Sequence, residues 1–113
     1  MNDTCVFCRI AGGQIPATLV AQNEYAVAFR DLDPKAPVHV LVIPRRHVAS
    51  LAEAGDQAEL GALMLLAAEV ARLEGVAESG FRTVLNSGSD GGQSVFHLHA
   101  HVLGGRPMGW PPG

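Results

Sequence analysis

Apolar residues recur along this chain at two spacings, one typical of strands and one typical of a helix. Residues 38–43 are apolar on both faces except at His39, and the run stops at Pro44, which predicts the most interior strand of a sheet. Before it, the β-prone segments 19–20 and 25–30 flank a short break that contains an asparagine. This arrangement predicts a hairpin.

One long helix is expected in the middle of the chain. Asp56, with Glu59 three residues later, resembles a capping box, and Gly75 can end the helix. Between them, apolar residues recur at helical spacing: Leu60, Leu63, Met64, Ala67, Val70 and Ala71. With Leu66 and Leu73 the apolar arc covers about half of the circumference, more than the roughly 100° needed against one sheet face. Either a second packing partner, such as another subunit, or burial in the chain's own core would explain that width.

Two further strands are expected after the helix. Residues 81–86 form one, and residues 95–103 form another that ends at the glycine pair 104–105. Strands then outnumber helices, and a single connection is long enough to hold a helix, an order that predicts an α+β fold with a mainly antiparallel sheet. The chain has 113 residues, 48% of them hydrophobic, and shows no repeat or linker. Residues 1–113 are therefore expected to form one domain.

Composition disfavours several functional classes. The net charge is −3 at pH 7, and the lysines and arginines are scattered singly apart from Arg45-Arg46, so no basic stripe suggests polymeric nucleic acid as a ligand. The first residues lack a basic region followed by an apolar run, and no stretch approaches about eighteen uninterrupted apolar residues. A cytoplasmic, soluble protein with no membrane partner is expected.

The strongest indication of function is a row of three histidines at alternate positions, His97, His99 and His101. On a strand they would share one face, each roughly 6.5–7 Å from the next. The other face would be apolar: Phe96, Leu98, Ala100 and Val102. Such a row suits metal ligation, or nucleophilic and acid/base chemistry. A lone histidine is usually an ordinary residue with a satisfied hydrogen bond, but clustering weakens that interpretation.

His39 strengthens the functional interpretation, because it is the only polar side chain in the most apolar strand. A buried imidazole needs a hydrogen-bond partner, and the histidine row is the natural candidate. A catalytic metal held by the row is the rival interpretation. It lacks an acidic residue within the row to orient a metal-bound imidazole, although one could come from elsewhere in the fold.

A loop rich in glycine and serine, residues 87–94, directly precedes the histidine row. Its successive backbone N–H groups, the hydroxyls of Ser87, Ser89 and Ser94 and the amide of Gln93 are suited to phosphate oxygens. Loops of this composition are usually mere turns, and the P-loop pattern is absent. Its position nevertheless predicts a phosphate cradle beside a nucleophile.

Cys5 and Cys8 are the only cysteines in the chain. Only four residues precede Cys5, whereas a thioredoxin-type redox motif follows a strand, so redox chemistry is disfavoured. A closed zinc site would need two more ligands, and His47 and one end of the histidine row are candidates. A pair of reduced thiols on a short N-terminal helical turn is the alternative.

Residues 97–103 match the motif HxHxHxx, with x apolar, and the chain resembles members of the histidine triad superfamily, in particular its nucleotide-binding, nucleoside phosphoramidase branch. The similarity runs from about Phe7 to Gly113. Further matching segments are Ile15-Pro16-Ala17, Phe29-Arg30-Asp31-Leu32, Ala36-Pro37, His39, Leu41-Val42-Ile43-Pro44, His47, Asn86, Gly88-Ser89-Asp90-Gly91-Gly92-Gln93-Ser94-Val95, Leu103-Gly104-Gly105-Arg106 and Trp110-Pro111-Pro112-Gly113.

The resemblance implies a five-stranded antiparallel sheet with one long helix and a short N-terminal helix. Two copies would form a homodimer with a continuous ten-stranded sheet, through their long helices and last strands. It also implies an enzyme that cleaves purine nucleoside 5′-phosphoramidates through a covalent nucleotidyl-histidine intermediate, with no cofactor in catalysis. A non-catalytic nucleotide-binding module that serves regulation or scaffolding and a metal-dependent hydrolase are the alternatives.

Catalytic roles follow from positions in the motif. His99 would attack the α-phosphorus, and His39 would hydrogen-bond and orient the reacting histidine. His101 would bind the phosphate, and Ser94 would support the leaving nitrogen by a hydrogen bond or a proton relay. A neutral imidazole is a good nucleophile at pH 7 and its phosphoryl adduct is labile, so one difficult displacement becomes two easier ones.

The resemblance also implies the nucleotide contacts. Asp31 would hold the ribose hydroxyls, and Leu32, Phe7 and Ile10 would wall the base. The phosphate would be bound by His99, His101, Asn86, Ser94 and the Gly92-Gln93 backbone.

Members of the superfamily with a CxxC pair resemble its zinc-binding branches. This similarity implies a structural zinc on four residues, two of them in the N-terminal turn 1–13: Cys5, Cys8, His47 and His97. The C-terminal tail, residues 104–113, would lie near the dimer partner's site, where Trp110 would shape amine specificity. Gly109 stands where many members have a histidine, so an amine preference that depends on that histidine is not expected to carry over.

Overall fold

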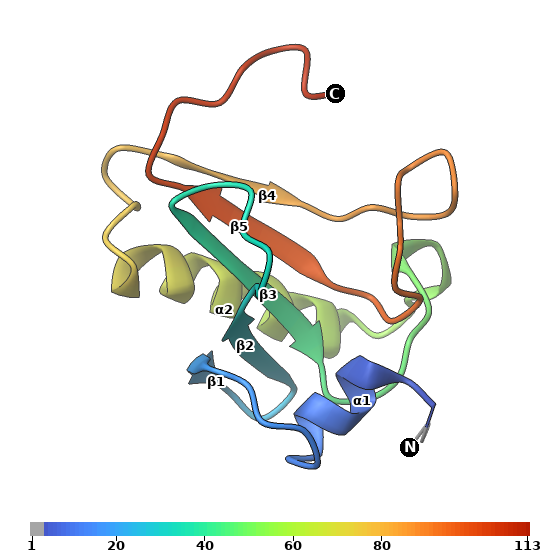
Figure 1. The fold of residues 1–113 in the computed structure, drawn as a ribbon. Coiled ribbons are helices and arrows are strands. Elements are labelled where there is room, and N and C mark those ends of the chain that lie inside the picture. Colours follow the sequence, from blue (N-terminus) through green and yellow to red (C-terminus); the bar gives the residue numbers. More distant parts are fainter. Residues whose placement is uncertain (1–3) are drawn as a thin grey trace.

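The computed structural model describes residues 4–113. Five antiparallel strands form one sheet in the order β1-β2-β3-β5-β4 (Figure 1). The strands are β1 (Leu19–Gln22), β2 (Ala26–Arg30), β3 (Val38–Pro44), β4 (Phe81–Val84) and β5 (Ala100–Gly104). The helices are α1 (Val6–Ala11), α2 (Gln57–Leu73) and a short 3-10 turn (Leu51–Glu53). The expected α+β fold, with one long helix and a short N-terminal helix, is confirmed.

The central strand β3 divides the core into two layers. Val40 and Val42 lie in the cluster under α2, whereas Leu41 and Ile43 point to the opposite face, into a smaller cluster that contains Phe7 of α1. Because successive side chains of a strand alternate, one apolar run can serve both layers. The helix α2 crosses the back of the sheet in Figure 1, and α1 lies against the other face near the end of β3.

The helix α2 begins as expected, but its cap is one-sided. The Asp56 side chain accepts a hydrogen bond from the Glu59 N–H at 3.1 Å. The Glu59 carboxylate, instead of returning the bond, is buried and accepts two hydrogen bonds from Arg46, at 2.9 and 3.2 Å. Arg46 therefore ties the segment after β3 to the start of α2.

The apolar arc of α2 is wider than this chain's own sheet can cover. Leu66 is buried, while Met64, Leu65 and Leu73 are 40%, 71% and 58% exposed. Burial in the chain's own core therefore does not account for the whole arc. Within residues 4–113, no helix has both the length and the apolar composition that crossing a bilayer requires.

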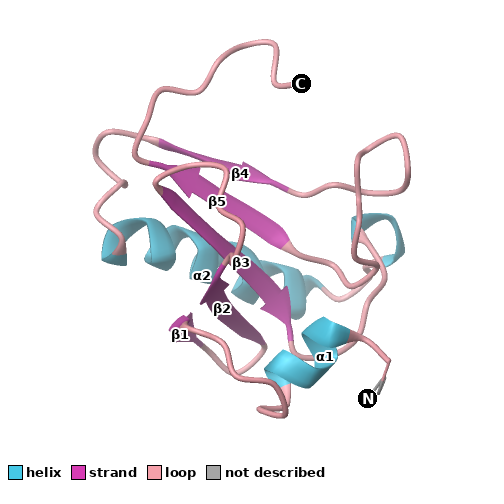
Figure 2. Cartoon of the chain, viewed as in Figure 1, coloured by secondary structure: helices cyan, strands magenta, loops and turns pink. Residues whose placement is uncertain are grey.

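The last two strands are shorter than the sequence pattern predicts. The strand β5 starts only at Ala100, so His97 and His99 lie in the bent segment before it, drawn as loop in Figure 2. Ladder pairing stops there because the Pro44 carbonyl accepts from the His97 side chain and the Leu98 N–H donates to the Val48 carbonyl.

Alternation survives this bend in part. Leu98, Ala100 and Val102 lie in the core under α2, as expected. Phe96, expected on the same apolar face, is 56% exposed and does not share the buried environment of these three residues.

The open edges of the sheet belong to β1 and β4. The last strand, β5, pairs with β3 on one side and β4 on the other. The ladder hydrogen bonds of β5 are therefore already used on both sides, and the expected pairing between the last strands of two copies stays a prediction. A shared sheet at this side of the molecule would have to form through β4.

Candidate active site and metal centre

The first cavity, of about 320 Å³, opens on the sheet face that carries α1. One wall is apolar, and the other end carries histidines and a carboxylate. Of the nucleotide-site residues expected from sequence, the cavity brings together Phe7, Ile10, Asp31, Leu32, Ser94, His99 and His101. Leu32 lies at the rim with 99% of its side chain exposed. An apolar slot that ends in polar groups suits a flat ring with a charged substituent.

A second cavity, of about 390 Å³, adjoins the first. It contains His39 and Asn86, two expected site residues that do not line the first cavity, whereas Gly92 and Gln93 line neither. Asp31, Ser94 and His101 line both cavities and form the boundary between them. A ligand that reaches across this boundary would place one end in an apolar slot and the other in a polar, more exposed one.

The hydrogen bond of His99 fixes its tautomer. Its Nδ1 lies 2.7 Å from the His97 backbone carbonyl, which can only accept, so Nδ1 carries the proton. In the neutral form of the ring, the other nitrogen, Nε2, then has the lone pair. His99 is buried but lines the first cavity, and Phe7 meets its ring edge-on with centroids 5.1 Å apart. In that form the ring offers one nucleophilic nitrogen, Nε2.

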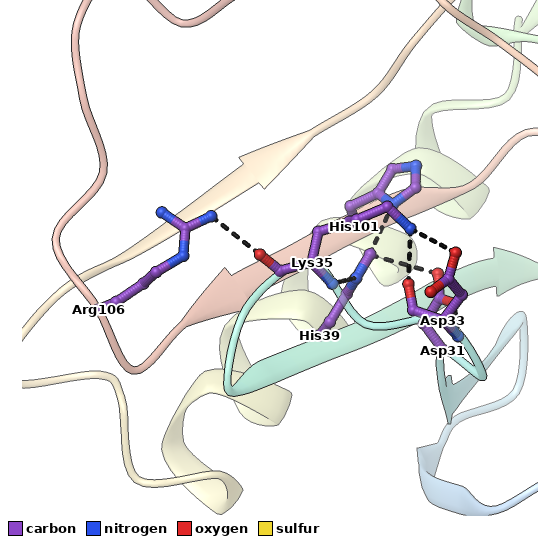
Figure 3. A network of polar contacts seen from close by, with 6 residues as sticks. All are labelled: Asp31, Asp33, Lys35, His39, His101 and Arg106. Atoms are coloured by element: carbon purple, nitrogen blue, oxygen red, sulfur yellow. Dashed lines mark hydrogen bonds and ion pairs between the residues drawn. The ribbon is translucent and has the colours of Figure 1, made fainter.

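A chain of hydrogen bonds fixes the tautomer of His101 as well (Figure 3). The Lys35 backbone N–H donates to His39 Nδ1 at 3.0 Å, so the His39 proton is on Nε2. That Nε2–H donates to His101 Nδ1 at 2.9 Å. The Asp31 carboxylate lies 3.4 Å from His39 Nε2. His101 must therefore carry its proton on Nε2, as a donor that an anionic ligand can use.

Burial keeps these imidazoles neutral. It is the main cause that lowers the pKa of His101 to about 4, and the neighbouring rings of His99 and His39 act in the same direction. Burial also lowers the pKa of His39, although the Asp31 carboxylate opposes that shift. At pH 7 both histidines are therefore uncharged, as the hydrogen-bond chain requires.

The glycine and serine loop is braced from inside. The Gln93 side chain is buried, accepts from the Gly88 N–H and donates to the carbonyls of Ala49 and Val95. The backbone N–H groups of Gly92 and Gln93 also bond within the loop. The structure therefore gives these two residues, expected to contact phosphate, the role of holding the loop in shape. Ser94, at its end, faces both cavities.

The Cys/His cluster, defined as Cys5, Cys8, His47 and His97, meets the first cavity at Phe7, which lines the cavity and packs against the His97 ring. Cys8 Sγ is 3.3 Å from His47 Nδ1 and 3.4 Å from His97 Nδ1, and Cys5 Sγ is 3.3 Å from His97 Nδ1. The sequence-based set is thus brought together from residues up to 92 positions apart. These four donors could hold a metal ion.

The donor set fits a tetrahedral zinc site. With Zn–S near 2.3 Å and Zn–N near 2.0 Å, the N···S edge of a tetrahedron is about 3.5 Å, close to the separations here. His97 Nε2 lies 2.9 Å from the Pro44 carbonyl, which fixes its proton there and turns the Nδ1 lone pair toward the sulfurs. Burial lowers the pKa of His97 and keeps it in the neutral form that a metal needs.

A second group of donors joins the histidine row to a carboxylate. Asp31, His39 and His101 have ligand atoms within 4.8 Å of one another, so the acidic residue that the row lacked does come from elsewhere in the fold. The two histidine nitrogens, however, are only 2.9 Å apart. Bonds of about 2.0 Å from both to one metal would require an angle near 90°, whereas a hydrogen bond explains the separation directly.

Two site features had no counterpart in the sequence reasoning. The Lys35 N–H, which fixes His39, is a backbone group, and no side-chain pattern indicates it. Phe29 and Leu41 line the first cavity, and strand alternation from the buried β3 could have indicated them. Trp110, expected near a partner's site, is 82% exposed and lies under the Arg82 guanidinium, 5.8 Å from its ring.

Comparisons with known proteins agree with this geometry. The HIT domain family model matches residues 12–108. An uncharacterised HIT-like protein of Synechococcus elongatus is 49% identical over 115 residues, with both chains covered completely. The crystal structure of a HIT family hydrolase from Legionella pneumophila is 47% identical with a TM-score of 0.92, covering 96% of this chain and 99% of the other. A histidine triad protein from Clostridium difficile is 40% identical with a TM-score of 0.91, covering 96% of both chains.

Proposed function

The chain belongs to the HIT domain family, and on that premise we propose that it hydrolyses purine nucleoside 5′-phosphoramidates through a covalent nucleotidyl-histidine. The observation that carries this proposal is the tautomer of His99, whose Nδ1–H is bound to the His97 carbonyl at 2.7 Å. The bond leaves Nε2 as a lone pair beside the cavity. Simple nucleotide binding does not require a nucleophile there.

In the first step, the Nε2 lone pair of His99 forms a bond to the α-phosphorus while the P–N bond breaks. The leaving amine receives a proton from solvent, and Ser94, on the boundary of the two cavities, is placed to relay it. Positive charge that develops on the His99 ring is stabilised through the Nδ1–H bond to the His97 carbonyl. The amine then departs through the second, more polar cavity.

In the second step, water attacks the phosphorus of the adduct, the bond to Nε2 breaks, and the nucleoside monophosphate leaves. The proton lost by water goes back through the same polar groups. The His101 Nε2–H donates to a phosphoryl oxygen in both steps, because the chain through His39 keeps that nitrogen protonated. A neutral donor also avoids the charge that a protonated imidazole would place in a buried site.

The proposed substrate contacts follow from the lining of the first cavity. An aromatic base fits the apolar wall formed by Phe7, Ile10 and Leu32, and Asp31 is placed to accept from ribose hydroxyls. The relative from Legionella pneumophila is a hydrolase, which supports catalysis over a purely regulatory module. The metal-dependent alternative is weaker, because the 2.9 Å contact of His39 with His101 is already a hydrogen bond.

The test is to capture the adduct. Wild-type protein mixed with a fluorogenic adenosine phosphoramidate should release the amine and, after a rapid acid-free quench, gain the mass of one nucleotidyl group on His99. The variant His99→Ala should do neither while still binding AMP. Glu24→Ala, at an exposed position between β1 and β2, is the control with expected wild-type turnover. Wild type that binds AMP but neither turns over nor forms an adduct would support the non-catalytic module instead.

A structural zinc on the Cys/His cluster is the second part of the proposal. The converging donors support it: two sulfurs and two imidazole nitrogens separated by 3.3–3.4 Å where measured. Such a site would hold α1, which contains Cys8 and is capped by Cys5, against the segments of His47 and His97. Metal analysis of the purified protein should find one zinc per chain, and the double variant Cys5→Ser/Cys8→Ser should lose it.

We also propose a homodimer. Its support is the exposed apolar arc of α2, with Leu65 and Leu73, and the open edge of β4 beside Phe81, which is 39% exposed. Pairing through β4 would give the continuous ten-stranded sheet. Sedimentation should find two chains per particle, and Leu65→Glu should shift the protein toward monomers.

A further inference from the structure

His97 belongs to the Cys/His cluster and to the site of the nucleophile at once. Its fully buried imidazole places Nδ1 3.3 Å from Cys5 Sγ and 3.4 Å from Cys8 Sγ. Its backbone carbonyl accepts the 2.7 Å hydrogen bond that orients His99. The same residue, His97, therefore contributes its side chain to the cluster and its backbone carbonyl to the bond that sets the tautomer of His99.

The peptide unit between His97 and Leu98 is held on both sides. Its carbonyl accepts from His99, and its N–H, which belongs to Leu98, donates to the Val48 carbonyl at 2.6 Å. Val48 directly follows His47, whose Nδ1 lies 3.3 Å from Cys8 Sγ. The cluster therefore joins the two segments whose backbones share this hydrogen bond, at positions adjacent to it.

The helix α1 makes a second connection. Phe7 lies between the two cysteines in sequence, and its ring packs edge-on against both His97 and His99, with centroids 5.9 and 5.1 Å away. Phe7 also lines the first cavity. Contacts that hold Cys5 and Cys8 in the cluster thus also hold Phe7 against the nucleophile.

We propose that His97 is a positioning residue through which the Cys/His cluster keeps the nucleophile in its reactive tautomer and orientation. When the four side chains are held together, the His97-Leu98 peptide and Phe7 confine the His99 ring. When the cluster is loosened, the carbonyl moves and His99 samples both tautomers. The catalytic consequence rests on the proposed function: misplacing a reacting group by about 1 Å can cost about 100-fold in rate, so a 10–100-fold slower adduct formation is expected.

The variant Cys5→Ser tests this coupling with little change to α1. Cys5 is the N-cap residue of the helix, and its sulfur accepts from the Cys8 N–H at 3.4 Å. Serine is a preferred N-cap residue and can accept the same bond, so the helix keeps its cap while the cluster loses one sulfur. Val70→Ala is the matched control, because Val70 is fully buried under the sheet and belongs to neither site.

Two measurements on proteins purified with Zn²⁺ decide the outcome. The ¹⁵N resonances of the His99 ring, assigned with His99→Gln, report its tautomer without any substrate, and single-turnover mixing with the adenosine phosphoramidate reports adduct formation. The proposal expects a single Nδ1–H tautomer in wild type and Val70→Ala, and mixed tautomers with the slower adduct in Cys5→Ser. An unchanged tautomer in Cys5→Ser overturns it, and so does an equal change in both variants, which would reflect general destabilisation.

The two proposals can fail separately. If wild type forms no adduct, the proposed function fails, and the ring nitrogens of His99 still test the coupling. If wild type turns over normally and Cys5→Ser keeps the wild-type rate and tautomer, the hydrolase stands and the positioning role of His97 is rejected.

Discussion

Replacing His39 by phenylalanine should cost much of the activity although the residue does not reach the phosphorus in the proposed mechanism. Phenylalanine is similar in size and keeps the apolar contacts of the buried ring, but it removes two hydrogen bonds, from the Lys35 N–H at 3.0 Å and to His101 Nδ1 at 2.9 Å. His101 then has no donor that holds its proton on Nε2. Its ring can adopt the other tautomer, which offers the phosphate a lone pair in place of a proton.

The magnitude follows from those two bonds. A buried group left without its partner costs about 1–3 kcal/mol, and the Lys35 N–H is only partly buried, so a loss of about 2–3 kcal/mol in stability is expected. Loss of the neutral donor from the transition state should cost a further catalytic factor. A change of about 1.4–2.7 kcal/mol in the barrier corresponds to a 10–100-fold lower kcat, with a smaller change in KM.

The assay is steady-state hydrolysis of the fluorogenic phosphoramidate at a temperature where both proteins are folded by circular dichroism. Lys35→Ala is the matched control, because it removes the side-chain amine, which bonds to Asp33, but keeps the backbone N–H that fixes His39. Its kcat should stay within about threefold of wild type. If His39→Phe retains the wild-type kcat, the hydrogen-bond chain does not set the protonation of His101 and the reasoning is refuted.

Three further predictions concern stability. Arg46→Ala should destabilise the fold by about 2 kcal/mol, because it leaves the buried Glu59 carboxylate unpaired; breaking a fully buried pair would cost about 3–5 kcal/mol, but the Arg46 side chain is 61% exposed. Adding Glu59→Gln should recover part of that stability in urea titrations, and no recovery would contradict this explanation. Burial lowers the pKa of His101 from 6.5 to about 4, so the unfolded chain binds more protons than the folded protein between these two pH values. Stability should therefore fall as pH is lowered from 7 to 5, and an equal or higher urea midpoint at pH 5 argues against this. Removal of zinc by a chelator should lower the Tm of wild type but leave that of Cys8→Ser unchanged, and equal shifts would point to a metal bound elsewhere.

The histidine row has acquired three distinct environments. His97 faces the cysteines, His99 faces the apolar cavity, and His101 is bonded to His39. In each case the nitrogen that is not free for chemistry is fixed by a neighbour, a backbone carbonyl for the first two and a histidine for the third. Three copies of one residue type thus differ in function because their partners differ.

Local sequence patterns determined most of the framework. The uninterrupted apolar run identified β3 as the central strand, because a strand buried on both faces needs apolar residues at every position. The Asp56 cap and the helical spacing located α2, and the break after β1 located the hairpin. These features depend on neighbours within a few positions, so they can be read from the sequence. The motif of alternate histidines likewise indicated the site before its geometry was known.

Only the tertiary structure decided how those residues act. The start of β5 at Ala100 depends on bonds from the segment of His97 and Leu98 to Pro44 and Val48, about 50 positions away, and no local pattern contains them. The same is true of the carboxylate of Asp31 beside His39, and of the single backbone N–H that sets two tautomers. Spacing specifies which side chains share a face, whereas the position of each proton depends on partners that folding brings from distant parts of the chain.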